Sequence, residues 1–233
     1  MAERKQVVVV TGAFGALGSA VARRFQGQGA TLGLIDRAAV PSTAAGSFTA
    51  PHVLAGGIDL TDECATQSAF RRVTDSAGGL DVLVNVAGGF RFQTLGEGDL
   101  AIWELMFAVN LKTALVASRA ALPHLKARGG GRIINIGAGA AARGHKGMGA
   151  YTASKAGVER LSESLAEEVK DLNITVNTIL PGTLDTPANR ADMPQADTGR
   201  WVAPEAVADV IAFLASDQAR AVTGAAIRVF GRG

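Results

Sequence analysis

Seven short runs rich in Val, Ile and Leu alternate along the chain with longer segments of helical pattern. The apolar runs lie at residues 7–10, 31–35, 53–58, 82–84, 132–136, 175–180 and 226–230. Continuous apolar runs of this length are typical of strands buried on both faces of a sheet. The helical patterns lie at residues 17–28, 62–77, 99–128, 150–172 and 204–215. This alternation predicts an α/β fold, in which a doubly wound parallel sheet carries helices on both faces.

The chain is long enough for one full-sized hydrophobic core. It has 233 residues, of which 48% are hydrophobic and 19% are charged, and this composition excludes a disordered chain. Glycines at residues 29, 78–79 and 129–131 mark helix ends. No repeat and no long linker interrupts the pattern, apart from an Ala/Ser/Thr-rich loop at residues 38–50. We therefore expect a single domain over residues 1–233.

Charge and cysteine content narrow the possible partners. The net charge is only +2 and no run of five like charges occurs, so no nucleic-acid partner is expected. No apolar run reaches about 18 residues and the N-terminus has no signal-peptide core, so we expect neither a membrane partner nor a leader.

The single cysteine, Cys64, excludes an internal disulfide, and such low cysteine usage is typical of proteins of the cytoplasm. His52, His124 and His145 are isolated, so no metal site is expected.

A glycine-rich turn follows the first predicted strand. Residues 11–18 read TGAFGALG and open the first helix. Glycines permit a tight turn, and they let backbone N–H groups approach a pyrophosphate at a helix N-terminus, although a structural turn without a ligand is the alternative. The second strand ends at Asp36, where a carboxylate accepts both ribose hydroxyls of NAD and repels the 2′-phosphate of NADP. We therefore expect NADH to be preferred over NADPH. Binding of NADP stays an alternative, because the Arg37 side chain could pair with the 2′-phosphate.

Two further features indicate a cofactor contact and acid–base catalysis. The first is Asp59, which follows the third strand and either contacts the adenine edge of the cofactor or caps the helix that starts near residue 62. The only tyrosine, Tyr151, stands four residues before Lys155 on a predicted helix, so the two side chains share one face. A nearby ammonium lowers the pKa of a phenol from its usual value of about 10 and prepares it for acid–base catalysis. A surface Tyr/Lys pair is the alternative interpretation.

Together with NVAG at residues 85–88, Asn110 and the PGxxxT segment at residues 181–186, these motifs resemble the short-chain dehydrogenase/reductase family along essentially the whole chain. The resemblance implies a Rossmann-type sheet of seven strands in the order 3-2-1-4-5-6-7, with a nicotinamide cofactor across the strand ends. It implies that Tyr151 is the general acid/base and that Lys155 binds the nicotinamide ribose and lowers the pKa of Tyr151. Asn110 would hold a water that links Lys155 to solvent.

The resemblance also implies which residues contact the cofactor. They belong to the glycine turn, the ends of the second and third strands, the NVAG segment, the catalytic pair and the segment after the sixth strand: Gly12, Phe14, Gly15, Ala16, Leu17, Gly18, Asp36, Arg37, Asp59, Leu60, Asn85, Ala87, Gly88, Tyr151, Lys155, Pro181, Gly182, Leu184 and Thr186. Two positions depart from the family pattern. Ala16 replaces the second glycine of the turn, and Val86 replaces the second Asn of the family's NNAG.

A third departure affects the chemistry itself. The family serine that hydrogen-bonds the substrate carbonyl falls 13 residues before the tyrosine, where this chain has Ala138. No other Ser or Thr can replace it, because none occurs between Ser118 and Tyr151. The loss of one donor to a developing oxyanion costs about 2.7–4 kcal/mol. Either the enzyme is impaired for simple ketones, or its substrate does not need this donor.

One subgroup of the family fits the second option. Residues 180–197 (LPGTLDTPANRADMPQAD), residues 15–19, the AGGF run at residues 87–90 and Ala138 are similar to dihydropteridine reductases, which use NADH to reduce a quinonoid dihydropterin. A conjugated, electron-poor ring accepts hydride without a localised oxyanion. Three functions stay open: an NADH-dependent reductase of such a conjugated compound, an ordinary alcohol/ketone dehydrogenase or reductase with Ala138 in the serine position, and a weakly catalytic dinucleotide-binding sensor or scaffold.

The substrate and a second subunit complete the expected contacts. Residues from the loops over the nicotinamide are expected to line the substrate site: Ala138, Phe90, Arg91, His145, Met148, Met193 and Trp201. For three of these residues the alternative is a role without substrate contact. His145 would then lie in solvent, and Met193 and Trp201 would only anchor their loop. The long helices at residues 99–128 and 150–172 are rich in small apolar residues. In the family they form a subunit interface, so the resemblance implies a homodimer or tetramer.

Overall fold

Seven parallel strands form one sheet in the order β3-β2-β1-β4-β5-β6-β7, which confirms the expected fold class and strand order. The computed structural model describes residues 5–49 and 51–232. Residues 1–4, where we expect no leader, residue 50 at the end of the expected loop, and residue 233 lie outside it. The strands are β1 (Val7–Thr11), β2 (Thr31–Ile35), β3 (Val53–Ala55), β4 (Val82–Asn85), β5 (Gly131–Ile136), β6 (Ile174–Pro181) and β7 (Ala226–Val229).

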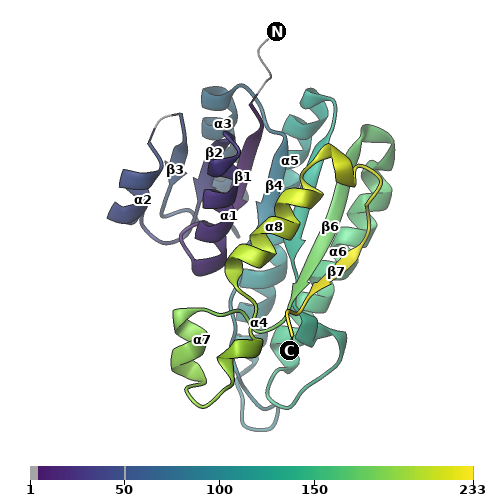
Figure 1. Cartoon of the computed structure of the whole chain (residues 1–233). Coiled ribbons are helices and arrows are strands. Elements are labelled where there is room, and N and C mark those ends of the chain that lie inside the picture. Colours follow the sequence, from purple (N-terminus) through teal and green to yellow (C-terminus); the bar gives the residue numbers. More distant parts are fainter. Residues whose placement is uncertain (1–4, 50, 233) are drawn as a thin grey trace.

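Helices cover both faces of this sheet (Figure 1). They are α1 (Ala16–Gly27), α2 (Ser42–Ser47), α3 (Glu63–Ala77), α4 (Leu100–Met106), α5 (Thr113–Arg128), α6 (Gly149–Val169), α7 (Pro187–Asp192) and α8 (Pro204–Leu214). Val8 and Val10 of β1 belong to the core shared with α1 and α8, while Val7 and Val9 belong to the core shared with α3, α5 and α6. The run Val7–Val10 is therefore apolar at every position, because successive side chains of β1 enter opposite cores.

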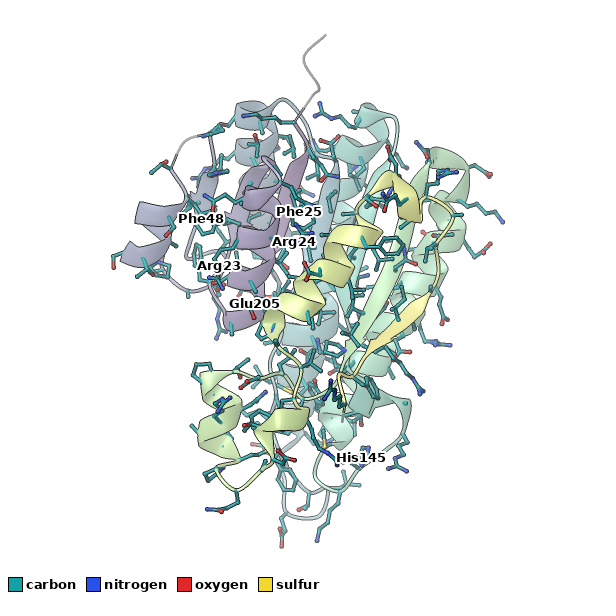
Figure 2. The ribbon with its side chains drawn as sticks, viewed as in Figure 1. Arg23, Arg24, Phe25, Phe48, His145 and Glu205 are labelled. Carbon is teal, nitrogen blue, oxygen red and sulfur yellow. The ribbon has the colours of Figure 1, made fainter. Side chains whose placement is uncertain are left out.

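Two ion pairs on the surface join α1 to α8. Arg24 lies 2.6 Å from Asp209, and Arg23 lies 3.6 Å from Glu205. Figure 2 shows the arginines on α1 facing Glu205 on α8. All four side chains are exposed, so these pairs contribute little stability, and the apolar contact beneath them holds the two helices together.

The expected helix at residues 99–128 is continuous but contains a π-helical turn. This turn, η1 (Phe107–Lys112), separates α4 from α5 and carries Asn110. Single π turns inside α-helices occur frequently at functional sites. Within the described residues one helix, Leu100–Arg128, is apolar and long enough to cross a membrane by length and composition alone. The same test is passed by core helices, and Ala117, Ala121 and Leu125 of this helix are fully buried beneath the sheet.

Three elements differ from the expectations. The strand expected at residues 53–58 ends at Ala55, because Gly57 turns the chain with a φ of +74°. The loop expected at residues 38–50 contains the short helix α2. Another short helix, α7, follows β6 and begins at Pro187, with the hydroxyl of Thr186 accepting a hydrogen bond from the Asn189 N–H at 3.2 Å. Helices of six residues leave too little periodicity to be read from sequence.

Candidate active site

The carboxyl ends of the strands open into one large cavity of about 2090 Å³. Open parallel sheets place their ligands at this edge. The cavity has about twice the volume of the largest ordinary small-molecule pockets, which reach about 1,000 Å³. It extends from the glycine turn past the ends of β2 and β3 to α6, α7 and the segment that precedes α8. It has room for a dinucleotide together with a second small molecule.

The glycine turn forms a backbone cradle at one end of this cavity. Gly12 has a φ of +63°, and a Cβ atom there would lie 2.7 Å from the backbone nitrogen of Ala87. A Cβ atom on Gly18 would overlap the carbonyl oxygen of Gly12. Helix α1 begins after Gly15 without a side-chain cap, so its first N–H groups are left for an anion. The residues present therefore fit the pyrophosphate of a dinucleotide.

The carboxylate of Asp36 is held rigidly at the cavity wall. One oxygen accepts a hydrogen bond from the Phe14 N–H at 2.9 Å, and the other accepts one from the Ala38 N–H at 2.9 Å. An ionised carboxylate has about four acceptor positions, so each oxygen can still accept a ribose hydroxyl. Arg37 is exposed and lines the same part of the cavity. This arrangement fits the adenosine ribose of the cofactor.

Asp59 does not cap the following helix, so that interpretation is wrong. Its carboxylate accepts hydrogen bonds from the backbone N–H and the hydroxyl of Thr61, both at 2.8 Å, and these bonds lower the pKa of Asp59. Asp62 is the cap of α3, because it accepts from the N–H groups of Cys64 and Ala65. Asp59 and Leu60 line the cavity beside Asp36, as expected for contacts with the adenine end.

Tyr151 and Lys155 lie on α6 and both line the cavity. Lys155 is only 5% exposed, and its Nζ donates a hydrogen bond to the carbonyl oxygen of Ile136 at 2.7 Å. A charged side chain is rarely buried to this extent unless it has partners or a function. The alternative of a surface Tyr/Lys pair is therefore wrong.

The pKa of Tyr151 differs from the expectation. Burial raises the pKa of Tyr151 to about 12 and lowers the pKa of Lys155 to about 8. The expectation that Lys155 lowers the pKa of Tyr151 is therefore wrong. The loss of water opposes charge on both groups, and the Lys155 ammonium is directed at the Ile136 carbonyl. At neutral pH the phenol retains its proton and can act as an acid.

The burial of Lys155 predicts how stability depends on pH. Between about pH 8 and 10.5 the unfolded chain binds a proton on this amine that the native protein does not, so the Lys155 contribution to stability rises with pH. Denaturant unfolding should show Lys155→Met to be stabilised relative to wild type by about 3 kcal/mol more at pH 7 than at pH 10.5. Lys126→Met, which removes an exposed lysine from α5, serves as the surface control for this comparison. A constant difference for Lys155→Met would contradict the burial penalty.

The side chain of Asn110 connects a loop to α6. Its Oδ1 accepts from the Gly89 N–H at 2.9 Å, while its Nδ2 donates to the Gly89 carbonyl and to the Ser154 hydroxyl, both at 3.0 Å. Ser154 in turn donates to the carbonyl oxygen of Tyr151 at 2.7 Å. Asn110 is not among the residues that line the cavity. The structure shows it as a support for the site, and its expected water-holding role stays a prediction.

Asn85 is also placed behind the cavity wall, contrary to the expectation that it contacts the cofactor. It is 3% exposed, and its Nδ2 donates to Asn135 Oδ1 at 2.8 Å and to the Ser118 hydroxyl at 3.1 Å. The Thr11 hydroxyl lies 3.4 Å from Asn85 Oδ1 and accepts from the Ala87 N–H. Asn85 therefore holds β1, β4 and β5 in register beneath the site. Every other residue expected to contact the cofactor lines the cavity.

The opposite end of the cavity contains most of the residues expected to contact the substrate. Ala138 is 5% exposed and forms part of the wall, and the Phe90 ring packs against Tyr151. The other expected substrate residues that line this end are His145, Met148, Met193 and Trp201. Figure 2 shows His145 in the loop before α6, at the end of the molecule toward which the strands point. Arg91 does not line the cavity, because its guanidinium turns back to the Phe90 carbonyl.

Sequence reasoning missed several residues of this end, most clearly Arg228 in β7 and Phe230 directly after it. The guanidinium of Arg228 lies 5.7 Å from the centre of the Phe230 ring, and both line the cavity. A Cβ atom on Gly139 would overlap the Phe230 ring, so the ring covers the backbone beside Ala138. Arg143 and Arg200 line the same end. Because every parallel strand points its carboxyl end at the site, the expected strand order could have identified the residues after β7.

The parallel sheet, the glycine cradle and the buried Tyr/Lys pair at the strand ends together define a dinucleotide-binding oxidoreductase of Rossmann type. Among the described residues, no group of three or more His, Cys, Asp or Glu side chains is placed to hold a metal ion. The pattern of the family described as "short chain dehydrogenase" matches residues 6–197. The chain belongs to this family, whose members depend on NAD(P).

Known proteins resemble the chain over nearly its whole length. The cis-4-hydroxycyclohexanecarboxylate dehydrogenase of Sinomonas cyclohexanicum is 36% identical over 97% of this chain and 96% of its own. The 3-oxoacyl-[acyl-carrier-protein] reductase FabG of Vibrio cholerae is 31% identical over 97% and 96%. A crystal structure of a 3-ketoacyl-(acyl-carrier-protein) reductase from Brucella melitensis complexed with NADH superposes with a TM-score of 0.88, at 27% identity and 99% coverage of both chains. These relatives do not show the expected likeness to dihydropteridine reductases.

Proposed function

We propose that the protein is an NADH-preferring reductase of a small, conjugated, electron-poor compound such as a quinonoid dihydropterin. The observation that carries this proposal is Ala138, which lies buried in the wall of the substrate end where a simple carbonyl would need a donor. Reduction of a conjugated ring spreads the developing negative charge over several atoms. The contribution of one oxyanion donor is then small.

The residues of the site have distinct tasks in this reaction. When bound, the reduced nicotinamide supplies the hydride, and thus two electrons, to the substrate. Tyr151 donates the accompanying proton from its hydroxyl and is reprotonated from solvent. The buried Lys155, when protonated, places a positive charge near the site where a phenolate forms. Asn110 and Ser154 hold the helix that carries Tyr151.

An ordinary alcohol or ketone dehydrogenase/reductase is the second candidate function. It is favoured by the relatives, whose names describe a dehydrogenase of cis-4-hydroxycyclohexanecarboxylate and a reductase of 3-oxoacyl groups on acyl-carrier protein. A screen of NADH oxidation over pterins, quinones and ketones separates the two. Faster turnover of simple ketones than of every pterin and quinone would contradict our first choice.

Cofactor preference follows from Asp36. The wild-type protein should bind NADH at least about tenfold more tightly than NADPH, because a 2′-phosphate near the fixed carboxylate meets like charge. Isothermal titration calorimetry with both nucleotides measures this ratio. Asp36→Ser should narrow it, whereas Asp185→Ser, which alters a carboxylate outside the cavity lining, should leave it unchanged. Equal affinities of the wild type for the two nucleotides would refute the preference.

We also propose that the protein is a homodimer or homotetramer in the cytoplasm. Leu100, Phe107 and Leu115 are 76%, 40% and 46% exposed and are spaced by seven and eight residues, so they follow one side of a continuous helix. A second copy would cover this apolar stripe. Sedimentation equilibrium should return at least twice the monomer mass, and a monomer at micromolar concentration would contradict the proposal.

The proposed location in the cytoplasm rests on Cys64, the single cysteine of the chain, which has a free thiol. Cell fractionation tests this location.

A further inference from the structure

The side chain of Phe90 lies directly against the catalytic tyrosine. The centres of the Phe90 and Tyr151 rings are 5.0 Å apart, and the ring planes meet at 85°. This edge-to-face contact is a favourable arrangement for two aromatic rings. Phe90 is nevertheless 44% exposed and lines the cavity. Part of its ring therefore covers the phenol, while another part is accessible to a molecule that enters the substrate end.

The backbone of Phe90 is anchored to the same helix that carries Tyr151. Gly89, which directly precedes it, forms hydrogen bonds with Asn110 through both its N–H and its carbonyl group. Asn110 donates to Ser154, and Ser154 donates to the Tyr151 carbonyl. Two buried side chains thus fix the distance between the two ring-bearing segments, so the ring contact is a built feature of the site.

The loop of Phe90 is held at a second point further along the chain. The Gln93 N–H donates to the Gly147 carbonyl at 2.8 Å, which attaches the loop to the segment before α6. A Cβ atom on Gly147 would overlap the Phe92 ring, so the two segments pack closely there. Between these anchors Phe90 has limited freedom to leave Tyr151.

The polarity around Tyr151 agrees with a shielding role for Phe90. Burial is the cause that raises the pKa of Tyr151, and Ala138 contributes only a methyl group to the nearby wall. A phenol whose water is replaced by an aromatic ring retains its proton until a substrate arrives. A flat conjugated substrate can pack on the accessible part of Phe90, whereas a small aliphatic ketone gains little from this contact.

We propose that Phe90 is a specificity-determining residue, which shields the Tyr151 hydroxyl from water and selects flat, conjugated ring substrates that pack against its exposed side. The selection of ring substrates rests on the proposed function above. The shielding of Tyr151 does not, since it concerns the protein without substrate.

The first test uses the fact that Tyr151 is the only tyrosine in the chain. Tyrosinate absorbance near 295 nm therefore reports this one hydroxyl. At pH 10.5, with native circular dichroism retained, wild type should be less than about one-tenth ionised, and Phe90→Ala should be ionised several-fold more. Phe213→Leu is the matched control, since Phe213 is 47% exposed on α8 and outside the cavity lining. An unchanged tyrosinate signal in Phe90→Ala would overturn the shielding role.

The second test measures selection between two dicarbonyl probes. The probes are 9,10-phenanthrenequinone, which is flat and aromatic, and butane-2,3-dione, which is small and aliphatic. In Phe90→Leu the ratio of kcat/KM for the flat probe over the aliphatic probe should fall about 2- to 10-fold, mainly through KM. Phe90→Trp should retain the ratio, and Phe213→Leu should not change it. Equal effects of Phe90→Leu on both probes would overturn the selection.

The two failures can be told apart. If Tyr151→Phe retains full turnover, or if wild type reduces neither probe nor any pterin with NADH, the proposed function fails, and the tyrosinate measurement still decides the shielding role. If wild type reduces the probes through Tyr151 but the ratio is insensitive to Phe90, only the selection by Phe90 fails.

Discussion

A Tyr151→Phe variant is expected to lose turnover by about 10²- to 10⁴-fold while its affinity for NADH changes by less than about twofold. The substitution removes the hydroxyl that donates the proton, and general acid catalysis contributes a factor of this size. The ring and its contact with Phe90 are retained, so the shape of the site is preserved. Steady-state NADH oxidation measures the loss, and isothermal titration calorimetry measures NADH affinity.

A matched control removes a different hydroxyl from the same helix. Thr152 follows Tyr151 directly, and its hydroxyl donates to the Met148 carbonyl within α6 without lining the cavity. Thr152→Val should therefore retain turnover within a few-fold of wild type. Turnover of Tyr151→Phe within about tenfold of wild type would mean that another group supplies the proton.

An Ala138→Ser variant is expected to gain activity selectively. The new hydroxyl would point from the cavity wall and donate to a developing oxyanion, so kcat/KM for simple ketones should rise by up to about 10²-fold. For pterins or quinones the gain should stay below about threefold, because their charge is already delocalised. Steady-state kinetics with one substrate of each class measures the two gains.

Ala140→Ser provides the control for this gain. Ala140 lines the same cavity two residues further along, so its replacement adds an identical hydroxyl at a different position on the wall. It should change neither substrate class by more than about twofold. If Ala138→Ser accelerates pterins and ketones equally, the missing donor does not explain the substrate class.

Local sequence patterns were sufficient to predict the main strands and the glycine turn. Residues 31–35 form β2 as expected, and Asp36 lies at its end on the cavity wall. The glycine turn at residues 11–18 opens α1. Strand patterns and turn glycines depend on the dihedral preferences and polarity of a few neighbouring residues, so they can be read without the folded chain.

Other features depend on groups that are distant in the sequence. Asn85 belongs to a motif that indicates a cofactor contact, yet its amide donates hydrogen bonds to Ser118 and Asn135 behind the cavity wall. By sequence Asp59 is a candidate cap for the helix near residue 62, yet in the structure its carboxylate binds Thr61 and Asp62 caps the first turn of α3. Such outcomes depend on which partners the fold supplies.

The alternation of apolar strands and helices determined the fold class by itself. The resemblance to the family, which rests on motifs such as the glycine turn and the Tyr/Lys spacing, supplied the strand order and the expectation that the cofactor lies across the strand ends. The protonation of Tyr151 and the orientation of Lys155 could be determined only from the packing of the folded chain. Burial raises the pKa of Tyr151, and the Lys155 ammonium donates its hydrogen bond to the carbonyl oxygen of Ile136. The physical reason is that desolvation depends on every segment that packs around a group, whereas the apolar pattern that predicts a strand is contained in a few neighbouring residues.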